Sequence, residues 1–310
     1  MINYSVIIPH KNTPDLLQRC LDSIPIRDDV QVIVVDDNSD ADKVDFEHFP
    51  QWKGENYECY LTKEGKGGGY ARNIGLQHAI GTWVLFSDAD DYFTSDFQQA
   101  LDEIIDDSPD ITFFNATAVR SDDLSHSHRL DHLNQMHILY DKDPQKASLQ
   151  FRFLFGEPWC KIIRRDLISK WKICFDEIPI HNDTLFSYMV GYYAKNIGVN
   201  HSIVYCVTDA PGTVSKNPAK EVHYIRTAVF AKKNQFLYEH EIPLFDSLLL
   251  VPISDCATKK EWNNLVRCLF VARRYGFPVL GLLMRALTPN RLKPLVKFGM
   301  AKRFEYSYDV

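Results

Sequence analysis

The sequence predicts an α/β fold in which a mostly parallel central sheet is flanked by helices, with a helical extension after it. Through the first 120 residues, short β-branched runs alternate with segments whose apolar residues recur at helical spacing. This alternation is typical of parallel sheets with helices on their faces. From about residue 220 onward the pattern is helical. We therefore expect one domain built from parts 1–120 and 121–215, followed by a helical, basic extension over 216–310.

The elements expected in the first part can be justified in chain order. The run 5–9 is a short β-branched strand, and Asn12-Thr13-Pro14-Asp15 then supplies a capping side chain, an early proline and an acid for a helix. Residues 30–35 are almost entirely apolar, as in a strand buried on both faces. Further strands are expected at 57–61, 82–86 and 111–118, with helices at 70–80 and 97–105.

The second part has a weaker pattern. Residues 120–150 are polar with little periodicity, which predicts a long surface loop or short helices. A helix is expected over 184–193 and a strand over 203–207.

The composition indicates a cytoplasmic protein. Hydrophobic residues make up 45% of the chain and charged residues 25%, as in ordinary soluble proteins. The chain shows neither a signal-peptide pattern nor an uncharged apolar run of the ~18 residues that a membrane span needs. The seven cysteines are scattered without a C-x-x-C pair, which favours reduced thiols.

Charge is divided unevenly along the chain. Residues 256–310 contain eleven Lys and Arg against three acids, a net charge of +8, which leaves −14 for residues 1–255. The stretch 275–298 interleaves large apolar residues with cations, so it could lie on an anionic membrane surface, which would make the protein peripheral on the inner face of the cell membrane. A helical appendage with solvated cations is the open alternative, and no nucleic-acid partner is expected.

Two acidic clusters follow predicted strands. Asp36-Asp37 comes after the second strand, and Asp88-Ala89-Asp90-Asp91 comes after 82–86. In such sheets ligands bind beyond the carboxyl ends of the strands. Asp88 and Asp90 alternate along an extended chain and can face one site together. A hard divalent cation, Mn²⁺ or Mg²⁺, would relieve their repulsion.

Other candidate features are less specific. Lys66 to Gly69 form a glycine-rich loop entering a helix, where backbone N–H groups can face an anion, and Arg72 adds a cation. The histidines at 126, 128, 132 and 137 could suggest a metal site, but a solvated loop is preferred. Trp159 and Trp171 could stack on sugar rings, with core packing as the default.

Several motifs, in this order and spacing, resemble family 2 glycosyltransferases with the GT-A fold, of the bacterial surface-polysaccharide type. They are Ser5-Val-Ile-Ile-Pro9 with Asn12, Val34-Val-Asp36-Asp37-Asn38-Ser39, Gly69 through Ala71-Arg72-Asn73-x-Gly75, and Gly81 through Asp88-x-Asp90-Asp91. The resemblance continues in Trp159-x-Lys161, Arg164-Arg165, Phe175 and His181-Asn182-Asp183-Thr184-Leu185-Phe186.

The resemblance implies roles for individual residues. Pro9 and Asp37 would line the nucleoside pocket, with Asp37 on the base, and Arg72 would lie near the base and diphosphate. Asp88 would lie close to the ribose, Asp90 would bind the metal that bridges the diphosphate, and Asp183 would be the catalytic base. Supporting roles are expected for Asp36, Asp91, Asn182, Trp159 and Lys161.

The chain departs from the family's usual pattern at two of these motifs. Lys11 stands where the family usually has an aromatic residue, and Asn182 stands where it usually has a glutamate. Asp183 also precedes an expected helix, so an N-cap is its alternative role.

The function implied is an inverting, metal-assisted hexosyl transfer. The sugar would move from a nucleotide-sugar donor, expected to be a UDP-sugar, to the hydroxyl of a glycan or lipid-linked acceptor. A bound metal would act as a Lewis acid on the leaving diphosphate, and a carboxylate would take the acceptor's proton. Two alternatives stay open: a nucleotide-sugar-binding protein without turnover, and a D-x-D phosphatase.

Overall fold

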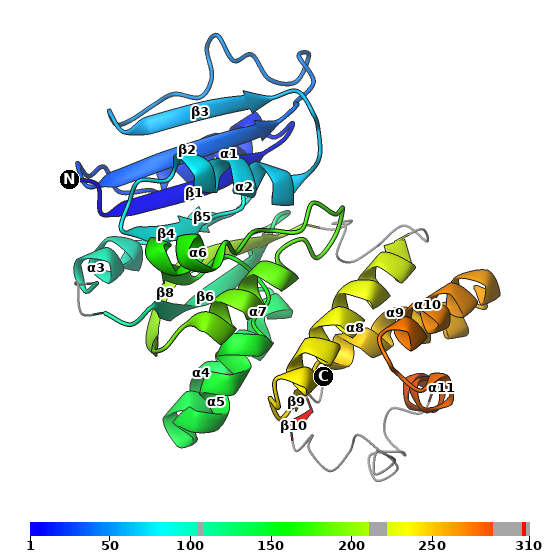
Figure 1. Cartoon of the computed structure of the whole chain (residues 1–310). Coiled ribbons are helices and arrows are strands. Elements are labelled where there is room, and N and C mark those ends of the chain that lie inside the picture. The colour runs from blue at the N-terminus through cyan, green and yellow to red at the C-terminus, as the bar shows by residue number, and fades with distance from the viewer. Residues whose placement is uncertain (105–107, 211–221, 288–305, 308–310) are drawn as a thin grey trace. The chain divides into compact units, whose positions relative to one another are not determined.

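The computed structural model describes residues 1–104, 108–210, 222–287 and the backbone of 306–307 (Figure 1). The chain divides into two compact units, Met1–Pro211 and Gly212–Val310. The basic run 291–298, part of the expected membrane-binding stretch, lies outside the described residues.

The first unit contains a mixed sheet of eight strands within its described residues, in the order β3-β2-β1-β4-β7-β6-β8-β5. Its half around β1 is parallel, because β1 pairs with both β2 and β4, and β2 pairs with β3. The other half is mixed, since β7 runs antiparallel to β4 and β6, β5 runs antiparallel to β8, and β6 is parallel to β8. The strands are β1 (Tyr4–His10), β2 (Val30–Asp37), β3 (Tyr57–Thr62), β4 (Trp83–Phe86), β5 (Tyr92–Phe93), β6 (Ile111–Arg120), β7 (Lys161–Arg164) and β8 (Ile197–Asp209).

The parallel half confirms the expected α/β pattern. Every residue of β2 is buried, as its apolar run predicts for a strand covered on both faces. The first three helices are α1 (Pro14–Asp22), α2 (Gly68–His78) and α3 (Asp96–Asp102), and α2 packs against β1 and β2 (Figure 1). Because β2 and β4 flank β1 in parallel, their carboxyl ends, which carry the two acidic clusters, lie at the same edge of the sheet.

Most of the segment 120–150 is helical, so short helices, rather than one long surface loop, are the correct alternative. It forms the short turn η1 (His128–Leu130), α4 (Asp131–Lys142) and α5 (Pro144–Phe153). Leu133, Met136 and His137 of α4 are buried at helical spacing. The exposed face is so polar that this short apolar row is hard to recognise in the sequence.

An aromatic cluster joins the two halves of this unit. Phe175 stacks on Phe186 with ring centroids 4.0 Å apart, and Phe86 meets both rings edge-on at 5.0 and 5.3 Å. Phe86 ends β4, while Phe175 follows α6 (Arg165–Trp171) and Phe186 lies in the first turn of α7 (Thr184–Tyr193). All three are fully buried, and each such side chain contributes roughly 1.5–3 kcal/mol of stability. The cluster therefore fixes the start of α7 against the end of β4.

The second unit is mainly helical, as expected. It contains α8 (His223–Glu239), β9 (Leu244–Phe245), η3 (Ser247–Leu249), α9 (Leu250–Thr258), α10 (Trp262–Arg274) and α11 (Val279–Leu287), and β10 (Tyr306–Ser307) pairs with β9. A buried ion pair between Lys233 and Asp246, 2.6 Å apart, fastens α8 to the turn before α9. Among the described helices of the chain, none has the length and apolar character to cross a bilayer.

We predict that Gly191→Ala destabilises the protein although alanine is the better helix former by about 1 kcal/mol. A Cβ at position 191 of α7 would lie 2.1 Å from the carbonyl oxygen of Arg152 in α5. Moving α7 away from α5 to fit the methyl group costs about 1–3 kcal/mol, so this overpacking should outweigh the gain in helix propensity and lower the melting temperature.

Gly281→Ala is the matched control, because among the described residues the added methyl in α11 would meet only the Pro278 ring, at 3.4 Å. Thermal unfolding should leave this variant unchanged or slightly stabilised. An equal response from both variants would contradict the close approach of α5 and α7.

Candidate active site

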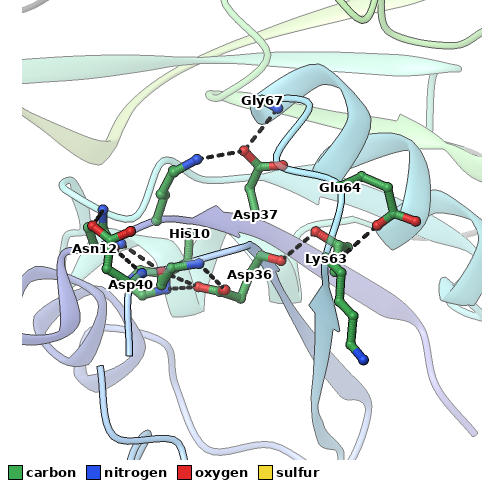
Figure 2. Close-up of polar contacts among 11 residues, drawn as sticks. His10, Asn12, Asp36, Asp37, Asp40, Lys63, Glu64 and Gly67 are labelled. Atoms are coloured by element: carbon green, nitrogen blue, oxygen red, sulfur yellow. Dashed lines mark hydrogen bonds and ion pairs between the residues drawn. The ribbon is translucent and has the colours of Figure 1, made fainter. Parts of the chain in front are cut away.

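The end of β1 is tied to the loop after β2 by a histidine–carboxylate contact. The Nδ1 of His10 lies 2.8 Å from Asp36 Oδ2, and its Nε2 accepts the N–H of Thr13 at 3.2 Å (Figure 2). The expected cap is therefore wrong in detail, since Thr13 makes no side-chain capping bond to the described helix α1. Asp36 also accepts the Ser39 hydroxyl at 2.5 Å and the Ser39 N–H at 2.8 Å.

Asp36 is thus a positioning residue. Burial raises its pKa, but the hydrogen bonds from His10 and Ser39 outweigh burial and hold the pKa of this carboxyl below its ordinary value. Both of its oxygens are used within the protein, and Figure 2 shows them directed toward the loop.

The neighbouring Asp37 has one carboxylate oxygen that can still accept a hydrogen bond. It is buried, its Oδ2 accepts the Gly67 N–H at 2.9 Å, and the Lys11 ammonium lies 3.5 Å from the same oxygen (Figure 2). Its Oδ1 is buried and has no hydrogen-bond partner among the described residues. Leaving a buried acceptor unpaired costs about 1–3 kcal/mol, so a ligand N–H at this oxygen would be stabilising.

Arg72 connects the second acidic cluster to the segment before α7. Its Nη2 donates to Asp88 Oδ1 at 2.5 Å, and its Nη1 donates to Asn182 Oδ1 at 3.0 Å. The guanidinium also lies over the Phe175 ring, 5.5 Å from the centroid. One buried cation therefore holds together residues that the sequence separates widely.

Gly69 explains how α2 reaches that segment. A Cβ on Gly69 would lie 2.1 Å from the Asp176 carbonyl oxygen and 3.0 Å from Asn182 Cβ. Only a residue without a side chain allows the first turn of α2, and with it Arg72, to approach this closely.

The acidic turn brings together the carboxylates of Asp88, Asp90 and Asp91, whose oxygens lie within 4.8 Å of one another. Burial and the neighbouring carboxylates raise the pKa of Asp90, and raise that of Asp91 further above its ordinary value. Asp91 Oδ1 accepts the Thr208 N–H at 2.7 Å, whereas Asp90 has no ion-pair partner in the part of the chain that the structure describes. Oxygen ligands gathered in this way could hold Mg²⁺ or Mn²⁺.

Tyr205 of β8 supports this turn. Sequence reasoning missed it, because its only signal was a hydroxyl-bearing residue in a predicted strand. Its hydroxyl accepts the Asp88 N–H at 2.9 Å and lies 3.1 Å from Ser87 Oγ. Its ring stacks on Trp159, with centroids 5.5 Å apart and planes 15° apart. Trp159 is therefore buried beneath the acidic turn, where its ring faces Tyr205.

Arg19 of α1 is a second residue that sequence reasoning missed. It donates to the Asp90 carbonyl at 2.5 Å and to Thr208 Oγ1 at 2.9 Å. The acidic turn is thus held from α1 and from β8 as well as by Arg72.

Asp183 lies at the N-cap position of α7 without acting as a cap. Its backbone is helical, and its side chain makes no capping hydrogen bond to the described helix. Burial, together with the charges of Glu157 and Asp88, raises the pKa of Asp183 to about 6, although Arg72 lowers it. Asp183 as a whole residue is only partly buried.

Lys161 holds the loop that carries Glu157. Its buried ammonium donates to the carbonyls of Phe155, at 2.8 Å, and Glu157, and lies 3.2 Å from Ser187 Oγ in α7. Ser187 in turn donates to the Gly156 carbonyl at 2.5 Å. Lys161 therefore fastens this loop to the helix that begins after Asp183.

The geometry brings most of the predicted residues into one network. Arg72 joins Asp88 and Asn182, Asn182 precedes Asp183, and Gly67 at the start of the same helix bonds Asp37. Pro9 lies in β1, paired in register with Val35 of β2.

Comparison with known proteins gives a family match. The chain matches the model of Glycosyl transferase family 2 over residues 5–171. It is 23% identical over 275 residues to a putative glycosyltransferase, EpsH, of Bacillus subtilis, covering 84% of this chain and 77% of EpsH. It is 25% identical over 205 residues to the poly(ribitol-phosphate) beta-N-acetylglucosaminyltransferase TarS of Staphylococcus aureus, covering 64% of this chain and 34% of TarS.

Solved structures confirm the fold. Residues 1–349 of S. aureus TarS, in complex with UDP-GlcNAc, match with a TM-score of 0.58 and 20% identity over 92% of this chain and 90% of that one. The mannosyltransferase PcManGT from Pyrobaculum calidifontis, in complex with GDP-Man and Mn²⁺, matches with a TM-score of 0.53 and 17% identity over 93% and 81%. The expected GT-A architecture is therefore confirmed.

The family match spans more than half of the chain and includes Asp37, Arg72 and the acidic turn. It excludes the D-x-D phosphatase alternative, which would need its nucleophile on the first strand, where β1 carries no carboxylate. This chain therefore belongs to glycosyl transferase family 2 and is a glycosyltransferase.

Proposed function

We propose that this enzyme transfers a sugar from a UDP-sugar to an acceptor hydroxyl with inversion at the anomeric carbon. The observation that carries the proposal is the Asp183 carboxylate. It is partly exposed, free of the capping role and raised in pKa, and Asn182 and Arg72 link its segment to the acidic turn. A base and a donor-binding turn are thereby held in one rigid network.

Asp37 is proposed to recognise the base of the donor. Its buried, unpartnered Oδ1 would accept the imide N–H of uracil, while Oδ2 stays on Gly67. UDP is favoured over GDP because TarS, solved in complex with UDP-GlcNAc, is a relative by sequence as well as by fold. Pro9, near the end of β1 and in register with Val35 of the neighbouring strand β2, is proposed to line this pocket.

The acidic turn is proposed to hold a divalent cation. Asp90 would be the protein ligand of this cation, since its carboxylate lacks an ion-pair partner among the described residues. Asp91, which accepts a hydrogen bond from the Thr208 N–H, would support the turn that carries Asp90. Asp88 stays on Arg72 and is proposed to face the ribose. When bound, Mn²⁺ or Mg²⁺ would offset the negative charge of the leaving diphosphate.

Asp183 is proposed to act as the general base. It would take the proton of the acceptor hydroxyl as that oxygen bonds to the anomeric carbon and the bond from that carbon to the diphosphate breaks. Attack from the face opposite the leaving group inverts the configuration. A pKa of about 6 suits this task, because the group is ionised at neutral pH and is a better base than an ordinary aspartate.

The acceptor is proposed to be a surface glycan or its lipid-linked precursor, in line with the poly(ribitol-phosphate) named for the relative TarS. Location in the cytoplasm, at the inner face of the membrane, stays a prediction, as does the three-part division of the chain.

Donor binding can be tested by thermal unfolding. UDP with Mn²⁺, at about 100 times its Kd, should stabilise the protein by about 2.7 kcal/mol, and UDP alone by less. Asp90→Asn should lose the Mn²⁺-dependent part, and Asp37→Asn should weaken the response to UDP. Asp42→Asn, an exposed acid in the loop after β2, is the control and should respond like the wild type. A response to GDP in place of UDP would contradict the base assignment, and no response to either would contradict the proposal.

Asp183→Asn should lower kcat for sugar transfer by about 10²- to 10⁴-fold while the KM for the donor changes little. Glu157→Gln is the matched control, because this carboxylate influences Asp183 without being assigned to the proton transfer. It should keep most of its transfer rate, measured by product chromatography. Full turnover by Asp183→Asn would overturn the base assignment, and loss of turnover only in Glu157→Gln would move it to Glu157.

The pH dependence follows from the raised pKa of Asp183. Transfer should fall as the pH drops through about 6, because the protonated carboxyl cannot accept the acceptor's proton. In Glu157→Gln this midpoint should move to lower pH, since Glu157 contributes to the raised pKa.

Stability should show the opposite dependence. Between about pH 4 and 6 the folded protein keeps a proton that the unfolded chain has lost, so the free energy of unfolding falls as the pH rises. A rise in pKa from 3.8 to about 6 would cost about 3 kcal/mol above pH 6, which screening of the partly exposed group should reduce to about 1 kcal/mol. Asp183→Asn should therefore melt higher than the wild type at pH 7.5 and equally at pH 4. An equal melting temperature at both would contradict the shift.

A further inference from the structure

Helix α10 of the second unit presents a row of large apolar side chains to solvent. Trp262, Val266 and Phe270 are 61%, 66% and 59% exposed and follow one another at four-residue spacing, so they lie on one face. The inner face, formed by Leu265, Cys268, Leu269 and Ala272, is buried in the core of the unit. An ordinary surface helix exposes polar residues on its outer face. This outer row is therefore a candidate contact surface.

The charges beside this row have one sign. Arg267, Arg273 and Arg274 are exposed on the same helix, and the Arg274 guanidinium lies 5.2 Å from the centroid of the Phe270 ring. From residue 262 to 304 the sequence contains nine Lys and Arg and neither Asp nor Glu. The complementary surface must therefore be anionic.

The combination of chemistry and size selects one kind of partner. Three side chains in a single row cover much less than the roughly 800 Å² per partner that a stable protein interface buries. A bilayer surface needs no matching pocket, and it accepts aromatic and aliphatic side chains at headgroup depth while its phosphates meet cations. We propose that the Trp262–Val266–Phe270 row of α10 contacts an anionic bilayer surface, with Arg267 and Arg274 on lipid phosphates.

This surface differs from the stretch 275–298 that the sequence singled out, and it lies wholly within described residues. It is also independent of the chemistry of transfer, since none of its residues belongs to the first unit. A membrane contact would concentrate the enzyme where a lipid-linked acceptor lies.

The test uses the full chain and co-sedimentation with vesicles of phosphatidylcholine alone or mixed with phosphatidylglycerol. The wild type should pellet with the mixed vesicles and not with phosphatidylcholine alone, and added salt should weaken binding. Trp262→Ser combined with Phe270→Ser should lower the apparent affinity at least tenfold. Arg267→Gln combined with Arg274→Gln should lower it and also reduce its salt dependence.

The matched control is Ile26→Ser combined with Leu61→Ser, which removes two exposed apolar side chains from the first unit and should bind like the wild type. All variants should keep the wild-type melting temperature and the wild-type stabilisation by UDP with Mn²⁺, so a folding defect or failure of the donor proposal would be seen separately. Unchanged pelleting of the Trp262 and Phe270 variant would overturn the inference. Dimers in light scattering that this variant loses would also overturn it, because the row would then be a subunit interface.

Discussion

The site depends on how one guanidinium divides its hydrogen bonds. Arg72 is buried between a carboxylate, Asp88, and a neutral amide, Asn182. Three carboxylates crowd the acidic turn, and without a cation their repulsion would favour opening it. Because Asn182 accepts a hydrogen bond without adding negative charge, the charge of Arg72 remains available to Asp88 and to Asp183. The neutral residue at position 182, where the resemblance led us to expect an acid, therefore moderates the basicity of its neighbour.

The side chains proposed to contact the substrate are positioned by hydrogen bonds from a second set of buried side chains. His10 fixes Asp36, which shapes the loop beside Asp37, and Tyr205 fixes the backbone at Asp88. Lys161 fixes the loop that carries Glu157. Each of these polar groups is buried and hydrogen-bonded, as the cost of unpaired polar atoms requires. Asp37 Oδ1 is one of several buried polar atoms without a hydrogen-bond partner among the described residues, and it belongs to a residue expected to contact the donor.

The sequence predicted those parts of the site that rest on local pattern. Alternating strands and helices placed both acidic clusters at one sheet edge, and the pattern at 184–193 gave α7 with the bounds that the structure has. It could not predict what depends on distant contacts. The stacking of Trp159 on Tyr205 joins segments about 45 positions apart, so the sequence indicated core packing for Trp159 as the default but could not identify its partner. Helices α4 and α5 were missed as definite helices because most of their surface is polar.

Tyr205 has a consequence for how such an enzyme could be divided or recombined. The family match ends at residue 171, before Asn182, Asp183 and Tyr205. A fragment cut there would keep the acidic turn but lose both the hydroxyl that holds its backbone and the carboxylate proposed to accept the proton. A chimaera that exchanges the acceptor-side part between two such enzymes would therefore have to include both α7, which follows Asp183, and β8. A segment that transfers the complete active site must therefore extend at least to the buried Tyr205, well beyond residues 5–171 that match the family.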